Sequence, residues 1–328
     1  MELYFAPLEG VTGYIYRNAF HNYFDSVGTE RCVDKFFSPF ISPGNHKKLT
    51  TKEQKDVNPE HNQNIILIPQ ILTNDATCFI RTANHLKELG YDEVNLNLGC
   101  PSGTVVAKHK GAGFLEDTYR LEAFFDEVFA GQSSKISVKT RIGLEARDEF
   151  ESLMCVFNQF PFTELIIHPR LRTDYYGNHP DLESFSYALE VAKMPVCYNG
   201  DIFSVEDYEK FVQQFPMVDK LMIGRGALAN PALFRNILGG SDMTVDEFSV
   251  FHDTLLEAYA VEMSGDRNLL FKMKELWNYW ICMFDDPKTY MRKIRKANTK
   301  SEYQIVVANM LRNDAFRGNL SYKPNILC

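Results

Sequence analysis

The sequence predicts an α/β protein: a (β/α)8 barrel of the TIM-barrel class, followed by a small domain made only of helices. Eight short runs rich in β-branched, aromatic or apolar residues recur up to residue 223, separated by stretches with helical periodicity. Eight is the strand count of such a barrel, and several runs are almost continuously apolar, as strands buried on both faces should be. Only helix-like segments follow residue 238.

The expected strands alternate with amphipathic segments that we interpret as crossover helices. In chain order the strands are Leu3–Pro7, Cys32–Phe37, Ile65–Ile71, Glu93–Asn97, Ile136–Arg141, Glu164–His168, Val196–Asn199 and Lys220–Ile223. The clearest helical segments between them are Ala76–Leu89, Leu121–Ala130 and Val205–Gln214. Periodicity also allows a doubly wound open sheet, and the count of eight favours the closed barrel.

The strand pattern ends near Leu238, and residues 239–242 (Gly-Gly-Ser-Asp) have the composition of a linker with a helix cap. We therefore expect a catalytic barrel domain over residues 1–238 and a helical domain over residues 241–328. The helices expected in this second domain are Val245–Met263, Arg267–Met283, Lys288–Lys296 and Ser301–Leu311.

Cysteine use predicts a cytoplasmic protein. The seven cysteines are scattered and form no close CxxC pair, which argues against a disulfide framework or a thiolate zinc site. The N-terminus lacks the pattern of a signal peptide, and no apolar run reaches the ~18 residues of a membrane span. We expect a protein of the reducing cytoplasm, with neither a membrane nor a metal as partner.

The net charge of −8 argues against a nucleic-acid partner, but its distribution points the other way. Residues 285–328 carry nine Lys/Arg against four Asp/Glu, whereas residues 241–284 carry three against eight. Five cations stand within nine residues: Arg292, Lys293, Arg295, Lys296 and Lys300. Such runs are usually solvated faces, but in an acidic protein this one favours contact with an RNA backbone.

The strongest chemical signal is Asn97–Pro101 (Asn-Leu-Gly-Cys-Pro), directly after the fourth expected strand. In a parallel barrel, the residues just beyond a strand's carboxyl end line the active face, so Cys100 is a candidate catalytic residue. Most free cysteines are inert packed residues, and composition alone favours that simpler interpretation.

Other polar residues stand at expected strand ends. Lys139 lies within a barrel strand, where either a bound anion or a structural ion pair must accompany it. His168 closes an apolar run and is either a ligand contact or a packed core histidine. The loops Asn199–Asp201 and Gly224–Gly226 follow the last two strands, where barrels commonly bind phosphate, although glycines that only make tight turns are the alternative.

Six short motifs occur in order at these strand ends. They are Ala6–Thr12 (APLEGVT), Asn97–Pro101 (NLGCP), Val138–Gly143 (VKTRIG), Ile167–Arg170 (IHPR), Asn199–Ile202 (NGDI) and Ile223–Ala227 (IGRGA). The ordered series resembles that of the tRNA-dihydrouridine synthase family, from residue 4 to about residue 236. Each motif is weak alone, but six in order are specific.

The resemblance implies reduction of D-loop uridines in tRNA to 5,6-dihydrouridine, with FMN as cofactor and NADPH as reductant. It implies hydride transfer from FMN N5 to C6 of uracil and a proton from Cys100 to C5. The residues implied to contact FMN are Pro7, Leu8, Glu9, Gln70, Lys139, His168, Asn199, Gly200, Asp201, Gly224 and Arg225. Those expected to contact tRNA are Asn97, at the target base, and Arg170, Arg172, Arg292, Lys293, Arg295 and Lys296.

Two other functions stay open at this point. One is an FMN barrel oxidoreductase acting on a small molecule, of the dihydroorotate or old-yellow type, in which a basic helical domain has no purpose. The other is a non-catalytic tRNA-binding protein, which the joint retention of Cys100, Lys139 and His168 argues against. The chain also departs from the family pattern: Ala232 replaces a common tryptophan, and the arginine spacing in His168–Thr173 is looser.

Overall fold

The computed structural model describes residues 1–44, 48–313 and 316–318. The chain divides into two compact units. The barrel unit consists of Met1–Glu9, Lys35–Gly200 and Met217–Met222, and the helical unit consists of Gly10–Asp34, Asp201–Pro216 and the chain from Ile223 onward. The expected domain boundary between residues 238 and 241 stays a prediction. The expected end of the helical domain, residues 319–328, lies outside the described residues.

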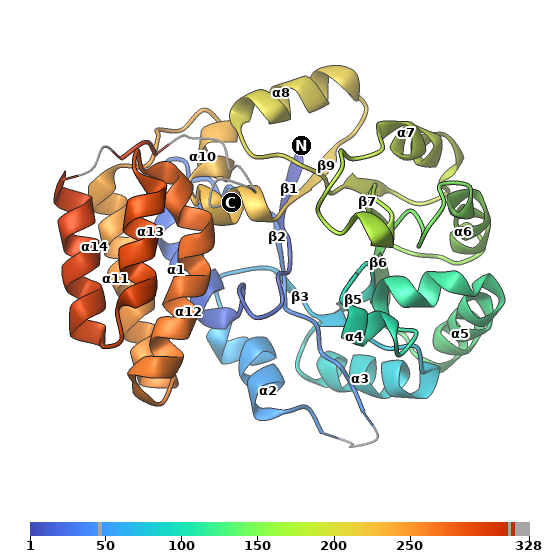
Figure 1. The fold of residues 1–328 in the computed structure, drawn as a ribbon. Helices are drawn as coiled ribbons and strands as arrows, with labels where there is room; N and C mark the ends of the chain where they lie inside the picture. The colour runs from blue at the N-terminus through green and yellow to red at the C-terminus, as the bar shows by residue number, and fades with distance from the viewer. Residues whose placement is uncertain (45–47, 314–315, 319–328) are drawn as a thin grey trace. The chain divides into compact units, whose positions relative to one another are not determined.

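The sheet of the barrel unit has nine strands in the order β3-β2-β1-β9-β8-β7-β6-β5-β4 (Figure 1). They are β1 (Glu2–Phe5), β2 (Lys35–Phe37), β3 (Leu67–Ile68), β4 (Gln70–Ile71), β5 (Glu93–Leu98), β6 (Lys135–Arg141), β7 (Glu164–His168), β8 (Val196–Tyr198) and β9 (Lys220–Ile223). The strands are parallel. The expected (β/α)8 barrel is confirmed.

The ninth strand arises because the third expected strand is divided at Pro69. Proline has no N–H for a ladder, so β3 pairs with β2 and β4 pairs with β5 on either side of it. The Pro69 carbonyl still accepts a hydrogen bond from the N–H of Asn95, at 2.9 Å. Because β3 and β4 are consecutive in the chain, the two ends of the sheet meet and the barrel is nearly closed.

The second strand is shorter than expected and begins only at Lys35. The N–H groups of Cys32 and Val33 donate to Asp25 Oδ1, at 3.1 and 2.7 Å. Since those donors are already satisfied within the helical unit, the residues carrying them do not extend a ladder.

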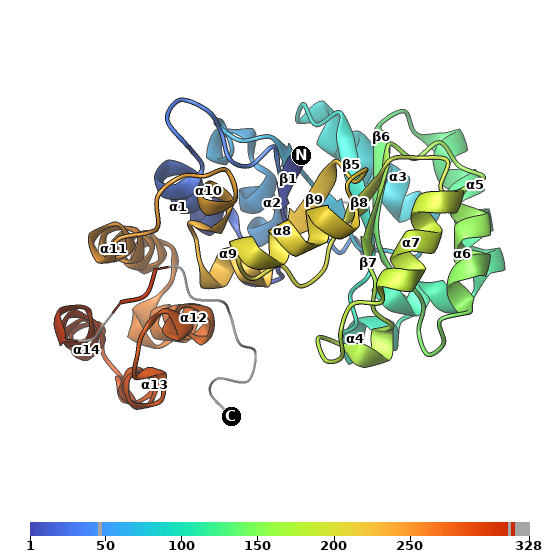
Figure 2. The same cartoon turned by 90° about the horizontal axis from the view of Figure 1, so that it is seen from above.

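Helices of the barrel unit cover the outer side of the strands (Figures 1 and 2). They are α2 (Thr51–Val57), α3 (Ala76–Glu88), α5 (Thr118–Gly131), α6 (Glu149–Phe157) and α7 (Leu182–Val191), whereas the short α4 (Gly103–Val106) belongs to the loop after β5. The expected helices at Ala76–Leu89 and Leu121–Ala130 are therefore present. Asp75, Asp117 and Asp181 cap α3, α5 and α7 by accepting hydrogen bonds from first-turn N–H groups.

The helical unit holds the remaining helices. They are α1 (Tyr14–Phe24), α8 (Val205–Gln214), α9 (Arg225–Ala229), α10 (Leu233–Ile237), α11 (Val245–Glu262), α12 (Gly265–Trp280), α13 (Pro287–Lys296) and α14 (Lys300–Asn313). The four helices expected after residue 241 are present. Trp277 and Trp280 are fully buried in this unit, and their rings pack edge to face. The Trp277 indole N–H donates to the Tyr303 hydroxyl at 2.7 Å.

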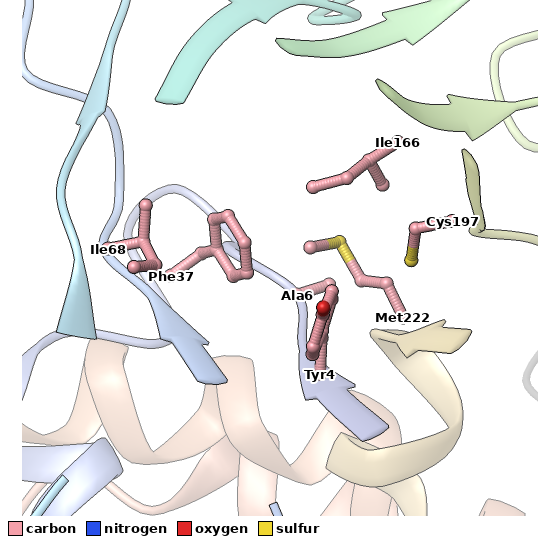
Figure 3. Packing of buried hydrophobic residues seen from close by; sticks show 7 residues of the cluster. All are labelled: Tyr4, Ala6, Phe37, Ile68, Ile166, Cys197 and Met222. Atoms are coloured by element: carbon pink, nitrogen blue, oxygen red, sulfur yellow. The ribbon is translucent and has the colours of Figure 1, made fainter. Parts of the chain in front are cut away.

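The barrel interior is a packed core rather than a channel. Seven buried side chains form this core, six from strands and Ala6 from the residue just after β1 (Figure 3): Tyr4, Ala6, Phe37, Ile68, Ile166, Cys197 and Met222. The rings of Tyr4 and Phe37 are in contact, with centroids 5.9 Å apart. Chemistry in this barrel must therefore occur at the carboxyl ends of the strands, where polar residues replace this core.

A buried carboxyl lies at the amino end of β7. Glu164 is 2% exposed, and its Oε1 lies 2.9 Å from the Tyr4 hydroxyl, which also lies 2.6 Å from Glu2 Oε2. Burial raises the pKa of Glu164 to about 7. One hydroxyl hydrogen cannot serve two carboxylates, so a protonated Glu164 donating to Tyr4 satisfies both contacts.

We predict that Glu164 makes the stability of the protein fall with rising pH. Its pKa is raised from 4.5 to about 7 on folding. Its contribution is therefore complete below pH 4.5 and is lost as the pH rises through 7. The free energy of unfolding should drop by about 2 kcal/mol from this group between pH 5 and 8.

The measurement is urea unfolding of the wild type and Glu164→Gln across that pH range. The amide does not ionise, so the difference between the two free energies should change with pH. Parallel pH curves for the two proteins would show that Glu164 does not titrate as described.

Candidate active site

The register of four neighbouring strands brings the candidate residues of the barrel unit together. Gln70 on β4 faces Asn95 on β5, Asn97 faces Lys139 on β6, and Arg141 faces His168 on β7. Residues two apart on a strand share a face, so Asn95 and Asn97 point the same way, as do Lys139 and Arg141. Tertiary pairing thus joins residues from three of the sequence motifs with Gln70 and Asn95, which lie outside them.

Asn97 sets the conformation of the turn that carries Cys100. Its side-chain Oδ1 accepts hydrogen bonds from the N–H groups of Gly99, at 3.0 Å, and Cys100, at 2.9 Å. These are the first donors beyond the end of β5, and the sheet ladder no longer serves them. Because both bonds end on the oxygen, the orientation of the amide is determined.

A chain of side-chain amides supports Asn97 from inside the barrel. Asn97 Nδ2 donates to Gln70 Oε1 at 2.7 Å, and Gln70 Nε2 donates to Asn95 Oδ1 at 2.7 Å. Asn95 Nδ2 then donates to the Ser137 hydroxyl at 3.0 Å. Gln70, the predicted flavin contact, is 1% exposed. Its side-chain oxygen and nitrogen are both used in this series of hydrogen bonds.

The Cys100 thiol is half-buried and remains protonated at neutral pH. Burial raises the pKa of Cys100 above its ordinary value of 9.0, although the nearby charges of Arg141 and Lys139 oppose the shift. The chain folds back over this residue at Gly111, which has φ +56°. A Cβ on Gly111 would lie 2.9 Å from the Cys100 carbonyl oxygen, so the close return requires glycine.

Lys139 presents a positive charge that has no acidic partner among the described residues. Its side chain is half-buried. Burial, followed by the nearby charge of Arg141, lowers the pKa of Lys139 to about 8. The ion pair that the sequence left open is thus not found in this part of the chain, and the lysine is suited to an anionic ligand group.

Arg141 joins the Cys100 turn to the loop after β7, a role that sequence reasoning did not assign. Its guanidinium donates to the carbonyls of Gly99 at 3.0 Å, Leu171 at 2.8 Å and Tyr175 at 2.6 Å. Burial lowers the pKa of Arg141 to about 10, so it stays charged at neutral pH. Two cations two positions apart on one buried strand, Lys139 and Arg141, were the signal available in the sequence.

His168 is held in one tautomer by Arg170. The Arg170 guanidinium lies 3.0 Å from His168 Nε2, and a guanidinium can only donate. His168 Nε2 is therefore the acceptor, and the imidazole proton is on Nδ1. Arg170 is 1% exposed and also donates to the carbonyls of Gly177 and Asn178. It holds the loop in this structure, and its contact with RNA stays a prediction.

The first motif lies at the end of β1. Leu8 packs against the barrel core, and Pro7 is half-buried beside it in sequence. Glu9 is exposed, and its Oε1 accepts a hydrogen bond from Lys52 Nζ at 2.8 Å. The contact of these three residues with a flavin stays a prediction.

Of the expected phosphate ligands, Asn199 and Gly200 belong to the barrel unit. Asn199 is buried, and its Nδ2 donates to the Met222 carbonyl at 2.8 Å. A Cβ on Gly200 would lie 1.9 Å from the Tyr198 hydroxyl, so packing alone requires glycine at this position.

The other expected phosphate ligands belong to the helical unit. Arg225 forms an ion pair with Asp201 at 2.6 Å, and its guanidinium lies 5.3 Å from the ring centroid of Phe203. Gly224 precedes α9. Phosphate binding by these residues stays a prediction.

The basic cluster of the helical unit lies on α13, which Asp286 caps. Met291 and Ile294 face inward, whereas Arg292, Lys293, Arg295 and Lys296 are exposed. Lys300 differs from them because it forms an ion pair with Glu257 at 2.8 Å. With Lys288 in the first turn, which is also exposed, five cations of this short helix face solvent.

Within the described ranges, no helix has the length and apolar character needed to cross a membrane. Those same residues contain no group of three His, Cys, Asp or Glu side chains that could hold a metal ion.

Solved structures show the same fold. Morphinone reductase matches with a TM-score of 0.50 at 13% identity, over 73% of this chain and 86% of its own. Histamine dehydrogenase from Rhizobium sp. 4-9 matches with a TM-score of 0.53 at 11% identity, over 73% of this chain and 45% of its own. These likenesses define the class of protein by fold, a (β/α)8 barrel.

The family is more specific than the fold. The family model described as dihydrouridine synthase (Dus) matches residues 4–316, and the chain belongs to this family of flavin-dependent oxidoreductases.

Two curated relatives are each 28% identical to this chain. The tRNA-dihydrouridine(16) synthase of Pseudomonas syringae pv. tomato covers 80% of this chain and 85% of its own length. The match to a probable tRNA-dihydrouridine synthase of Helicobacter pylori covers 84% of this chain and 82% of that protein. The tRNA-dihydrouridine synthase B of Pseudomonas aeruginosa is 27% identical, and the match covers 72% of this chain and 68% of that protein.

We predict that the Cys100 thiol reacts slowly with iodoacetamide at pH 7.5. Only a thiolate is alkylated, and burial raises the pKa of Cys100 above 9.0. The rate should rise roughly tenfold per pH unit up to about pH 8 and continue to rise beyond it. Quantitative mass spectrometry of the Cys100 peptide measures it, with glutathione in the same tube as the ordinary thiol. A rate that is already constant by pH 8 would contradict the raised pKa.

Proposed function

We propose that this protein reduces selected D-loop uridines of tRNA to 5,6-dihydrouridine, with FMN as its flavin and NADPH as reductant. The observation that carries the proposal is a half-buried thiol on a turn fixed by Asn97, near Lys139, which has no acidic partner among the described residues. Membership of the dihydrouridine synthase family and the names of the curated relatives support the substrate.

The residues present are suited to an anionic flavin. Lys139 supplies a half-buried positive charge without an acidic partner among the described residues. His168, with its proton on Nδ1, and Gln70 would assist it, together with Pro7, Leu8, Glu9, Asn199, Gly200, Asp201, Gly224 and Arg225. When bound, FMN would take two electrons from NADPH and supply hydride to C6 of the uracil.

Cys100 would act as the general acid. Its S–H bond breaks as the proton passes to C5 of the uracil, which completes the saturated C5–C6 bond. A raised pKa keeps the thiol protonated before the reaction, as a proton donor requires. The charges of Arg141 and Lys139 then favour the thiolate that is left, until solvent returns a proton.

Asn97 would both position the acid and bind the base. Its oxygen holds the Cys100 turn, and one Nδ2 hydrogen bonds Gln70. Among the described residues its second Nδ2 hydrogen has no acceptor, which leaves it for the target uracil. The uridine must leave its stack to reach these groups, at a cost of a few kcal/mol.

The exposed cations of α13 would contact the phosphate backbone of tRNA, at Arg292, Lys293, Arg295 and Lys296. Arg172 and Arg170 are further expected contacts, although Arg170 is buried here. Action on tRNA would place the protein in the cytoplasm.

We predict that the purified protein has a flavin spectrum that bleaches with NADPH without oxygen and recovers on adding unmodified tRNA. Cys100→Ala should bind FMN and tRNA normally and bleach with NADPH. It should nevertheless form dihydrouridine at least about 100-fold more slowly, because it lacks the general acid. Anaerobic absorbance and mass spectrometry of the tRNA nucleosides measure these outcomes.

Each departure from this result has a distinct meaning. Normal dihydrouridine formation by Cys100→Ala would remove Cys100 from the mechanism. A wild-type flavin that ignores tRNA would indicate an oxidoreductase for small molecules. A protein that cannot be reconstituted with FMN would overturn the enzymatic proposal.

We predict that the double variant Arg292→Gln/Lys296→Gln binds unmodified tRNA roughly tenfold more weakly at low salt, with a salt slope reduced by about 2. The control is Arg120→Gln/Lys210→Gln, which removes two exposed cations on α5 and α8. It lowers the net charge equally and should change binding much less. Equal losses in both variants would mean that net charge alone, rather than α13, determines tRNA affinity.

A further inference from the structure

The loop between β7 and α7 contains an aromatic residue in an unfavourable backbone conformation. Tyr175 has φ +50°, in the left-handed region that residues with a Cβ rarely adopt. The residue is 47% exposed, so burial of the ring does not offset this strain. Strain of this kind persists where the surrounding structure imposes it, and it concentrates at functional sites.

Hydrogen bonds to the backbone impose the conformation of Tyr175. Its carbonyl accepts from the Arg141 guanidinium at 2.6 Å, and its N–H donates to the Arg172 carbonyl at 3.2 Å. Two residues later, the Gly177 N–H donates to the Asp174 carbonyl at 2.7 Å. The turn is therefore built from main-chain contacts, and the tyrosine ring is not needed to close it.

A cation accompanies the exposed ring. The Arg172 guanidinium carbon lies 5.8 Å from the centroid of the Tyr175 ring. Arg172 Nε is buried and has no hydrogen-bond partner among the described residues. The half-buried Arg172 therefore places its guanidinium beside an exposed aromatic face, and these are the groups that bind a phosphate and a nucleic-acid base.

The same pair is linked to the catalytic turn. Arg141, which holds the Tyr175 carbonyl, also donates to the carbonyl of Gly99, the residue before Cys100. One buried side chain therefore sets the position of both Tyr175 and the turn of the general acid. A ligand on Tyr175 would lie on the loop that adjoins the reacting base.

We propose that Tyr175 and Arg172 form a second nucleotide-binding site, which stacks an unpaired RNA base flanking the target uridine and binds its phosphate. The inference rests on the proposed function. Holding the neighbour on Tyr175 would compensate for part of the cost of unstacking the target. Recognition would be tolerant of base identity, because every base has a π-face.

The experiment compares Tyr175→Gly, Tyr175→Phe and Asn178→Gly. Glycine at 175 removes the ring and relieves the strain together. Asn178 is the matched control, because it lies on the same loop with φ +52° and is not aromatic. The readouts are Tm, kcat and KM for unmodified tRNA, and the Kd for tRNA by fluorescence anisotropy.

We expect Tyr175→Gly to keep or raise Tm, while KM and Kd for tRNA rise roughly 5- to 100-fold and kcat changes little. Tyr175→Phe and Asn178→Gly should bind tRNA like the wild type. Arg172→Gln should weaken tRNA binding and reduce the salt slope by about 1.

Other outcomes overturn the inference. Unchanged KM and Kd in Tyr175→Gly, with an active wild type, would exclude the stacking role and leave the proposed function intact. A lowered Tm, or an equal loss in Asn178→Gly, would show that the ring or the loop geometry only maintains structure. A wild type that neither binds nor reduces tRNA would instead remove the proposed function on which the inference rests.

Discussion

The candidate site depends on one hydrogen-bonding requirement, which arises where β5 leaves the sheet. The N–H groups of Gly99 and Cys100 lie beyond the last ladder bond, and Asn97 Oδ1 serves both of them. These two hydrogen bonds orient the Asn97 amide and, through Gln70, the Asn95 amide as well. Buried polar groups without partners are costly, so each member of the chain constrains the next. The position of the thiol thus depends on residues of β4, β5 and β6.

The second feature of the candidate site is its positive charge. Lys139 and Arg141 bring two positive charges to the strand ends, and burial lowers the pKa of both. Arg141 is satisfied by three carbonyls, whereas Lys139 has no acidic partner in the described part of the chain. An anion would complete this arrangement. The same burial raises the pKa of the Cys100 thiol, so in the proposed reaction one environment would serve both an anionic cofactor and a neutral acid.

Much of the fold could be predicted, and much of the hydrogen bonding could not. Strand positions follow from local apolar runs, and the eight expected strands were found. Pro69 shows the limit, because its missing N–H divides a strand only when a neighbouring ladder exists to be interrupted. Arg170 is a second case in which the sequence could not predict the contacts. A polar residue on a loop suggests solvent or RNA, yet here it is buried against His168 and two carbonyls.

By itself, the sequence determined the barrel class, the helical region after residue 241, the family and the candidate acid Cys100. Those features depend on periodicity and on short motifs, which are local in the chain. Only the tertiary structure decided that Asn97 holds the Cys100 turn, that Arg141 joins this turn to the loop of Tyr175, and that Lys139 lacks an acidic partner among the described residues. Such contacts join residues tens of positions apart. Their existence depends on strand register and burial, which no local pattern encodes.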